Sequence, residues 1–422
     1  YVADGRGGLS IYELAALVGG AAPETGATAL ETKSGGSRAE PGEEQRLAAS
    51  RREDLARLTA AEQAAARLRV TYVGLFTPAG SAAVAVTHTV TTTADSGPGT
   101  LRAALLAAGP GDTILFDPAM FPPSQPATIT LQSALPPLAK GGLTLDGSSA
   151  GVVLDGRLLP DSELGLWLPS DGNAVRGLTL VHFALIGINV TGNDNTLGGD
   201  RGIGVGPSGQ GNVVGFSGGG IQLGALARGN HVEGNLVGTD PTGSVPWFNW
   251  TGVGLGIGPT GNYVGGTTAG RRNLISGNQT GVQLMGEGTN SNVVAGNSIG
   301  TDLTGSYAIP NQWGVRLEWS TAGNVVGGDS PEDRNWISGN SEHGVLLSDS
   351  GTANNAIIGN WIGTDASGNK PLGNQPGIGI YGCGYNRLGG SGAGEGNVIV
   401  SERGHGVDMA GYDASDNVIV GN

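Results

Sequence analysis

The stretch Asn292-Val-Val-Ala-Gly-Asn297-Ser-Ile-Gly-Thr-Asp302, followed by Gly314-Val-Arg-Leu317, decides the fold. It holds three short runs whose side chains alternate between inward and outward positions, which is the period-2 pattern of β-strands. Gly and Asn separate the runs and supply the left-handed backbone positions that tight turns need. Since no segment between runs suits a helix of about 10 residues, the sequence favours an all-β fold over alternating strands and helices.

The same pattern recurs along the chain, and asparagines open the apolar runs at a nearly constant interval. Successive members of the series lie 32, 30, 32, 31, 31 and 31 residues apart. A fixed period of about 20–50 residues indicates a solenoid, propeller or array. Three strands and three turns per period of about 31 residues predict one coil of a right-handed parallel β-helix, whose equivalent strands stack about 4.8 Å apart. The stacked amide side chains then form a ladder, predicted for Asn230, Asn262, Asn292, Asn324, Asn355, Asn386 and Asn417.

A second periodicity is superimposed on the first. The motif Gly-Thr-Asp ends at Asp240, Asp302 and Asp365, which lie 62 and 63 residues apart, so coils alternate between two types. Aspartates two coils apart are separated by about 9–10 Å, too far to share a Ca²⁺ ion. Because Asp-x-x-Gly is also a favourable turn sequence, we interpret these aspartates as turn residues. No metal site and no cofactor is predicted.

The repeat divides the chain into segments. We expect regular coils over 195–422, looser coils over 127–194, and a cap over 86–126 that covers the open end of the apolar core. Within the cap, 96–108 is predicted to be a short amphipathic helix and 112–116 a strand. Residues 1–85 are predicted to be a helical extension or linker, with a capping box over 10–13 and a longer helix over 43–69. Since the sequence stops in mid-coil without a polar cap, we expect further coils or domains beyond Asn422.

The composition limits the possible partners. Glycine makes up 80 of the 422 residues, only 14% of residues are charged, and the formal net charge is −14. An acidic chain without a cluster of Lys and Arg disfavours a nucleic-acid partner. The apolar runs are too interrupted for a transmembrane helix. A single cysteine, Cys383, excludes a disulfide within the chain, and we favour an extracellular or cell-surface location.

Three segments together resemble a known family. They are 91–104, which contains Asp95-Ser-Gly-Pro-Gly-Thr100, the strand Gly111-Asp-Thr-Ile-Leu-Phe-Asp117, and the repeated Asn-x-Ile-Ser-Gly-Asn and Ile-Gly-Thr-Asp units. Over about 86–422 the chain is similar to bacterial surface or secreted proteins of the right-handed parallel β-helix repeat class, in the pectin-lyase-like superfamily. The resemblance implies the fold. It implies no single function, because the superfamily includes polysaccharide lyases, glycoside hydrolases, epimerases and adhesins.

The catalytic patterns of these enzymes are largely missing from the sequence. Gly404-His405-Gly406 resembles the Gly-His-Gly of polygalacturonases, but Glu342-His343-Gly344 occupies the same repeat position, and the rest of that family's pattern is absent. The Arg-x-Pro-x-x-Arg of pectate lyases and the Asp-Pro-His of alginate epimerases are absent as well.

One strand position nevertheless combines acidic, basic and imidazole groups. The outward positions of the Gly-Val-x-Leu strands and their ends carry Glu318, His343 and Asp408. Together they could supply a lyase base or a hydrolase pair, and they are the candidate catalytic residues if the protein is an enzyme. The alternative is an ordinary solvated face of the solenoid.

Aromatic residues are few, so their positions are informative. Trp336 and Trp361 hold the same register, and the alternation that places Ile337 and Ile362 inside places both indoles outside. Exposed, stacked indoles on a rigid sheet form a platform for sugar rings. Alternatively, they cover a seam between faces. The candidate carbohydrate-binding residues are Trp336, Trp361, Trp313 and Trp319.

The sequence thus leads to two functional hypotheses. The first is a non-enzymatic extracellular or cell-surface module, structural or carbohydrate-binding in the manner of an adhesin, with a polysaccharide or cell-surface glycan as partner. The near-perfect repetition and the missing catalytic patterns favour it. The second is a polysaccharide lyase, glycoside hydrolase or epimerase on the same scaffold.

Overall fold

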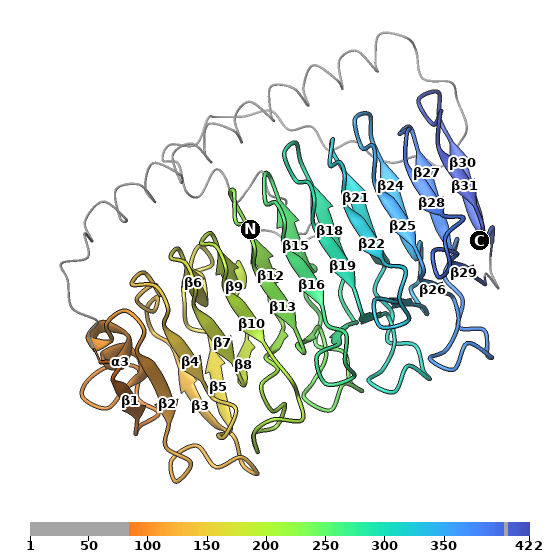
Figure 1. The fold of residues 1–422 in the computed structure, drawn as a ribbon. Helices are drawn as coiled ribbons and strands as arrows, with labels where there is room; N and C mark the ends of the chain where they lie inside the picture. The colour runs from red at the N-terminus through yellow and green to blue at the C-terminus, as the bar shows by residue number, and fades with distance from the viewer. Residues whose placement is uncertain (1–83, 401–403) are drawn as a thin grey trace. The chain divides into compact units, whose positions relative to one another are not determined.

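The structure is a computed structural model that describes residues 84–400 and 404–422. The predicted capping box over 10–13 and the predicted helix over 43–69 lie outside the described residues. Within them, strands of two to six residues form three parallel sheets that stack along one axis (Figure 1).

Each sheet takes one strand from each successive coil. Sheet A contains twelve strands: β1 (Thr87–Val90), β2 (Thr113–Phe116), β4 (Thr144–Asp146), β7 (Ala174–Arg176), β10 (Thr196–Gly198), β13 (His231–Glu233), β16 (Tyr263–Gly265), β19 (Val293–Ala295), β22 (Val325–Gly327), β25 (Ala356–Ile358), β28 (Arg387–Gly389) and β31 (Val418–Val420). Sheet B contains ten: β3 (Ala127–Thr130), β5 (Val152–Asp155), β8 (Leu178–Val181), β11 (Val213–Gly215), β14 (Leu236–Val237), β17 (Asn273–Ile275), β20 (Asn297–Ile299), β23 (Trp336–Ile337), β26 (Trp361–Ile362) and β29 (Val398–Ile399). Sheet C contains nine: β6 (Leu166–Leu168), β9 (Ile186–Val190), β12 (Gly219–Leu223), β15 (Thr251–Gly256), β18 (Thr280–Met285), β21 (Trp313–Glu318), β24 (Val345–Ser348), β27 (Ile378–Tyr381) and β30 (Val407–Ala410).

From β4 onward the chain visits sheets A, B and C in turn, and each strand pairs in parallel with its counterpart one coil away. Val315 of β21, for example, pairs with Val282 on one side and with Val345 on the other. This is a right-handed parallel β-helix, so the predicted fold class is confirmed. The predicted cap region, residues 86–126, contributes β1 and β2, the first two strands of sheet A, and β2 lies within the predicted strand 112–116.

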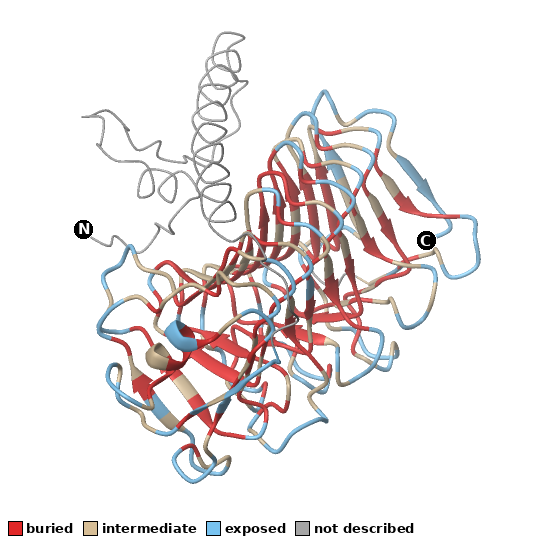
Figure 2. Ribbon diagram, turned by 60° about the vertical axis from the view of Figure 1, so that its left-hand side comes forward, coloured by how far each residue is buried: buried red, intermediate tan, exposed pale blue. Residues whose placement is uncertain are grey.

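Alternation along each strand fills the interior of the coils with aliphatic side chains. In Figure 2 most strand residues are accordingly coloured as buried. The core runs without interruption from Val90 to Leu388. Ile275 and Val315, expected to point inward, are both fully buried. Burying one such side chain contributes about 1.5–3 kcal/mol relative to leaving it exposed.

Buried asparagines form ladders along the axis, and the predicted one is present. Each amide Nδ2 donates to the Oδ1 of the next coil's asparagine, as in Asn262 to Asn292 at 2.9 Å. This first ladder contains the seven predicted residues and extends back to Asn195 and Asn173. A second ladder opens the strands of sheet B and a third lies at the turn between sheets B and C. Their members are Asn212, Asn235, Asn273, Asn297, Asn335, Asn360, Asn397 and Asn422, and Asn249, Asn278, Asn311, Asn340 and Asn374, respectively.

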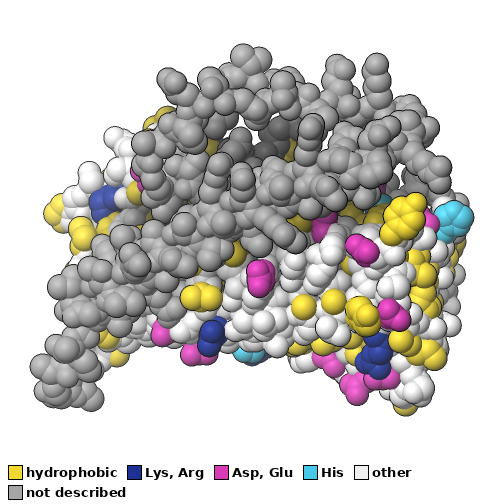
Figure 3. Space-filling model, turned by 90° about the horizontal axis from the view of Figure 1, so that it is seen from above, with side chains coloured by type: hydrophobic (Ala, Val, Ile, Leu, Met, Phe, Trp, Pro, Cys, Tyr) yellow, Lys and Arg dark blue, Asp and Glu magenta, His cyan; other side chains and the backbone are white. Residues whose placement is uncertain are grey.

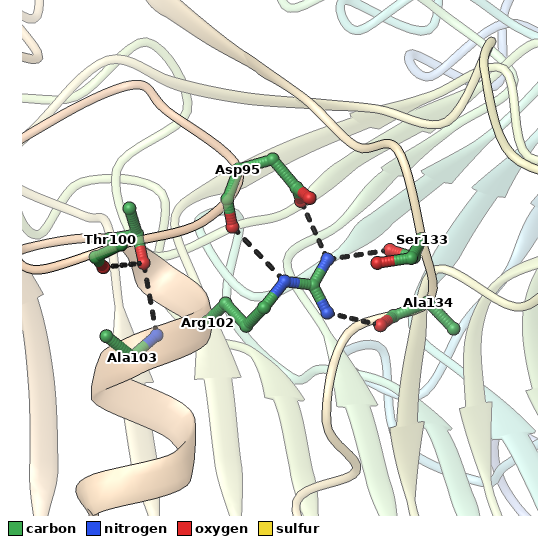
Figure 4. Close-up of polar contacts among 7 residues, drawn as sticks. Asp95, Thr100, Arg102, Ala103, Ser133 and Ala134 are labelled. Carbon is green, nitrogen blue, oxygen red and sulfur yellow. Dashed lines mark hydrogen bonds and ion pairs between the residues drawn. The ribbon is translucent and has the colours of Figure 1, made fainter.

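A short helix lies beside the first strands, as the sequence predicted. It is α3 (Leu101–Ala107), and its N-cap residue Thr100 accepts a hydrogen bond from a first-turn N–H. Figure 4 shows how Arg102 anchors this helix: its guanidinium donates to the Asp95 carboxylate at 2.7 Å and to the Ser133 carbonyl at 2.8 Å. These contacts tie the helix to the loop that follows β3.

The Gly-Thr-Asp aspartates are turn residues, since each carboxylate closes its own loop. Asp302 accepts hydrogen bonds from the Ser306 and Tyr307 N–H groups at 2.8 and 3.0 Å, and Asp240 accepts the equivalent pair at 2.9 Å each. The pKa of both carboxyls lies below the usual value, because hydrogen bonds from the Thr242 and Thr304 hydroxyls and from these N–H groups outweigh the opposing effect of burial.

These loops fold over the outer face of sheet B. Gly243, with φ +66°, lies against Leu274, and a Cβ there would come within 2.8 Å of that side chain. Gly368, with φ +72°, lies against Trp361 in the same way, and a Cβ there would come within 2.9 Å of the indole. Consecutive loops also bond to each other: the Leu303 N–H donates to the Gly243 carbonyl at 3.1 Å. The outer face of sheet B is therefore covered on every second coil.

Candidate functional site

The candidate site is the outer face of sheet C between β18 and β30. Val315 and Leu317 point into the core, so alternation directs Arg316 and Glu318 outward. The same rule directs Tyr381 and Asp408 outward on β27 and β30. The face thus collects polar side chains from successive coils.

Three of these side chains form a continuous hydrogen-bonded chain. The Tyr381 hydroxyl lies 3.0 Å from His343 Nε2 and donates to Asp408 Oδ2 at 2.8 Å. Burial, together with the hydrogen bond to Asp408, raises the pKa of Tyr381 to about 12. The phenol is therefore neutral at physiological pH and able to donate.

The direction of these bonds fixes the state of the imidazole. A carboxylate only accepts hydrogen bonds, so the Tyr381 hydroxyl donates to Asp408, and its oxygen accepts from Nε2–H of His343. Nδ1 then carries the lone pair, and this buried nitrogen has no hydrogen-bond partner among the described residues. Burial lowers the pKa of His343, against the charges of Glu342 and Asp408. The neutral imidazole therefore presents an unused basic nitrogen.

A glycine makes room for this imidazole. A Cβ on Gly379 would lie 2.5 Å from His343 Cδ2 and 2.8 Å from Nε2. Contacts under 3.0 Å essentially never occur for a real Cβ, so any larger residue at this position displaces the ring. The local sequence Gly379-Ile-Tyr381 supplies both the space for His343 and its hydrogen-bond partner.

A second polar group lies toward the N-terminal side of the same face. Glu318, only 3% exposed, accepts hydrogen bonds from Arg316 at 2.5 Å and from Gln283 at 2.6 Å. Burial raises the pKa of its carboxyl, although the positive charge of Arg316 opposes the shift. Arg316 Nε is buried and, within the described part of the chain, donates to no acceptor.

Arg316 connects the two groups. Its guanidinium lies over the Trp313 ring, 4.5 Å from the ring centroid. The backbone next to Trp313 is bonded to the following coil at His343, because the Gly314 N–H donates to the His343 carbonyl at 2.9 Å. The positive charge of Arg316 also contributes to the lowered pKa of His343, after the larger effect of burial. An unused donor and an unused acceptor therefore lie on neighbouring coils of one face.

The three candidate catalytic residues fall into both groups. His343 and Asp408 belong to one hydrogen-bonded chain, and Glu318 lies apart with Arg316. Tyr381, which joins His343 to Asp408, was not among the predicted residues, nor was Arg316. Strand register could have identified Tyr381. Leu347 on β24 pairs with Leu317, so the next residue, Ser348, is in line with Glu318, and Ser348 pairs with Tyr381.

The predicted carbohydrate-binding tryptophans lie on two sheets. Trp336 and Trp361 are register partners on sheet B, half-buried and directed away from the core. Guanidinium groups cover them: Arg272 lies 4.2 Å from the Trp336 ring and Arg334 lies 4.4 Å from the Trp361 ring. Their role in sugar stacking stays a prediction.

The other two tryptophans lie at the candidate site. Trp313 is the first residue of β21, and Trp319 directly follows that strand, with φ +57°. Both side chains are half-buried. Their binding of sugars likewise stays a prediction.

Other kinds of site are not evident in residues 84–400 and 404–422. No group of three or more His, Cys, Asp or Glu side chains is arranged there to hold a metal ion. The described part of the chain also has no helix that is long and apolar enough to cross a membrane. On the face shown in Figure 3, the Lys and Arg side chains are isolated among acidic and uncharged groups.

The fold and this sheet face define the class of the molecule as a parallel β-helix with a polar site on one sheet. No family model matches the chain, and no curated protein matches it in sequence. Among solved structures it is similar to the pectate lyase Pel9A, with 16% identity, 76% of this chain and 78% of that chain covered, and a TM-score of 0.43.

Two further solved structures show the same kind of likeness. The Azotobacter vinelandii mannuronan C-5 epimerase AlgE6 A-module is 14% identical, with 76% of this chain and 97% of that chain covered and a TM-score of 0.36. The catalytic domain of a GH87 α-1,3-glucanase in complex with nigerose is 12% identical, with 82% and 70% covered and a TM-score of 0.29. The three parallel sheets are those of the right-handed parallel β-helix expected from the sequence. Likeness at this level concerns the backbone and not the chemistry of the side chains.

Proposed function

We propose that the protein is an extracellular or cell-surface enzyme that acts on a polysaccharide at the outer face of sheet C. The observation that supports this most is the pair of unused, buried groups, His343 Nδ1 and Arg316 Nε. Buried polar atoms in native proteins are nearly always hydrogen-bonded, so an unsatisfied acceptor and donor on neighbouring coils favour a ligand that bonds to both.

The chemistry that suits these groups is removal of a proton next to a carboxylate. Arg316 would bind the carboxylate of a uronic acid residue, and His343 Nδ1 would take the proton from the adjacent carbon. Breaking the C–O bond on the next carbon then gives an unsaturated product, with the leaving oxygen protonated by solvent. Return of a proton to the opposite face of the carbanion gives epimerisation instead. Tyr381 and Asp408 would hold the imidazole in the tautomer that leaves Nδ1 free.

A glycoside hydrolase fits less well. Glu318 and Asp408 lie on β21 and β30, three coils apart, which corresponds to a backbone separation of about 14 Å. Paired glycosidase carboxylates lie about 5–9.5 Å apart. Within the proposed class we therefore favour a lyase or an epimerase.

The second candidate is a non-enzymatic module that binds glycans or has a structural role. The loops favour it, because the long Gly-Thr-Asp loops fold onto the outer face of sheet B and do not wall the face of sheet C. In this case Trp313 and Trp319 would contact sugar without turnover.

A polysaccharide screen that reads binding and product release together separates the two. The test variants are His343→Gln and Tyr381→Phe. His405→Gln is the matched control, because His405 has the same place in the repeat but is exposed. Unsaturated ends or epimerised residues that are lost in both test variants and kept in the control support the enzyme. Binding by the wild type without any product supports the glycan-binding module and contradicts the enzyme.

A further inference from the structure

Two aromatic residues occupy strained backbone positions at the corner between sheets B and C. His182, after β8, has φ +60°, and Phe216, after β11, has φ +56°. Later coils place Gly277 and Gly339 at the same position, with φ +75° and +73°. A left-handed backbone conformation costs conformational energy for a bulky residue, and other coils of this chain place glycine at this turn. The turn alone therefore does not explain the two aromatics.

These side chains continue into a stack. The His182 ring lies on Phe216 with centroids 5.2 Å apart and planes within 9°, and Phe216 lies on Trp247 at 5.2 Å and 28°. Phe216 nevertheless remains 43% exposed. The next residue after Trp247, Phe248, is also exposed and meets Trp250 edge to face at 5.4 Å. The corner therefore presents an aromatic surface to solvent.

A buried carboxylate orients the imidazole at one end of the stack. Asp155 is 2% exposed and lies 3.1 Å from His182 Nδ1. Because a carboxylate accepts, Nδ1 carries the proton and Nε2 of the neutral ring is left as an acceptor. Arg157 Nε also donates to Asp155, at 2.6 Å, while its side chain stays 60% exposed. The corner thus offers an acceptor and guanidinium donors beside the aromatic surface, with the charge of Asp155 balanced by Arg157.

We propose that His182, Phe216 and Trp247 form a second polysaccharide-binding site, separate from the outer face of sheet C. A pyranose ring combines C–H groups, which pack on aromatic surfaces, with hydroxyls, which bond to an imidazole nitrogen or a guanidinium. The balanced charge suits a hydroxyl-lined ring better than a free ion. That both sites bind one polymer rests on the proposed function.

The spacing of the sites has a measurable consequence. The coil that contains Phe216 and β12 lies three coils from the coil of β21, a separation of about 14 Å along the axis. A long chain can reach both sites, whereas a disaccharide cannot. Occupying a second site on the same chain raises the affinity for polymers without changing the chemistry at the first.

The coils that contain Gly277 and Gly339 indicate which substitution to use in a test. The test protein is the double variant His182→Gly/Phe216→Gly, in which both turns receive the glycine that other coils use at this position. The control is Leu226→Gly, because Leu226 is also exposed and has φ +65° but lies at another corner. Affinity electrophoresis in gels with polygalacturonate, alginate or laminarin gives the dissociation constants. Circular dichroism checks folding, and Phe216→Asn replaces the double variant if that does not fold, because Asn tolerates this backbone.

The expected result is that wild type and Leu226→Gly bind at least one polymer, and that the double variant binds it about tenfold or more weakly. Unchanged affinity of the double variant, or no binding of any of the three polymers by wild type, would overturn the second site. Product release, measured separately with His343→Gln, tests the proposed function. An inactive protein that still loses binding in the double variant therefore contradicts the enzyme and supports the second site.

Discussion

Replacing Asn292 by Ala tests how much the asparagine ladders stabilise the solenoid. The Asn292 amide donates to the Pro259 carbonyl at 2.9 Å and to Asn324 Oδ1 at 3.0 Å. Its own Oδ1 accepts from the backbone N–H and from Nδ2 of Asn262, at 3.1 and 2.9 Å. Four buried hydrogen bonds, each contributing about 0.5–1.5 kcal/mol net, predict a loss of about 2–6 kcal/mol in the free energy of unfolding.

Urea unfolding and hydrogen exchange measure this loss and where it falls. Asn290→Ala is the control, because Asn290 lies two residues earlier in the same turn and is exposed. Exchange should accelerate in the coils that contain Asn262, Asn292 and Asn324, and should change little in distant coils, since each repeat contacts only its neighbours. A loss below about 0.5 kcal/mol, no larger than that of the control, would refute a stabilising role for the ladder.

Three further predictions follow from single contacts. Gly379→Ala places a Cβ 2.5 Å from His343 Cδ2, so product release should fall to the level of His343→Gln while far-UV circular dichroism is unchanged. Val315→Asp buries an unpaired carboxylate and should lower the free energy of unfolding by about 4 kcal/mol or more; unchanged urea unfolding would contradict the inward position of this residue. The Val86 N–H and neighbouring donors lower the pKa of Asp112 from 3.8 to about 2, so the carboxylate stabilises the fold above pH 3.8 and this contribution is lost as the pH falls towards 2. Asp112→Asn should therefore have a lower melting temperature than wild type at neutral pH, but its melting temperature should fall less when the pH is lowered. Thermal unfolding measured between neutral pH and pH 2 checks both expectations.

The features set by one-dimensional spacing could be predicted from the sequence. The interval between asparagines gives the coil, and alternation gives the face on which Ile275 and Arg316 lie. The second and third ladders have the same kind of signal, since Asn273 and Asn335 recur at a fixed interval within the Asn-x-Ile-Ser-Gly motif. Neither was predicted, because the predicted ladder rests on the single asparagine that opens the first run of each coil.

The geometry of the candidate site could not be predicted in the same way. Alternation says that a side chain points outward, but not which way it leans across the sheet. His343 reaches Tyr381 on the next coil because Gly379 leaves the space above β27 empty. The grouping of His343 with Asp408, and of Glu318 with Arg316, depends on such local packing between coils.

The bonded Gly-Thr-Asp loops have a consequence for how such a chain can lengthen. Each loop bonds to the one two coils away, as Ala366 N–H does to the Gly305 carbonyl at 2.9 Å. Duplicating a single coil would continue all three asparagine ladders but would leave two loops without their partners. Duplicating two coils, from Asp240 to Thr301 for example, would preserve the contacts between loops. Growth of the gene by internal duplication is therefore expected to proceed in even numbers of coils.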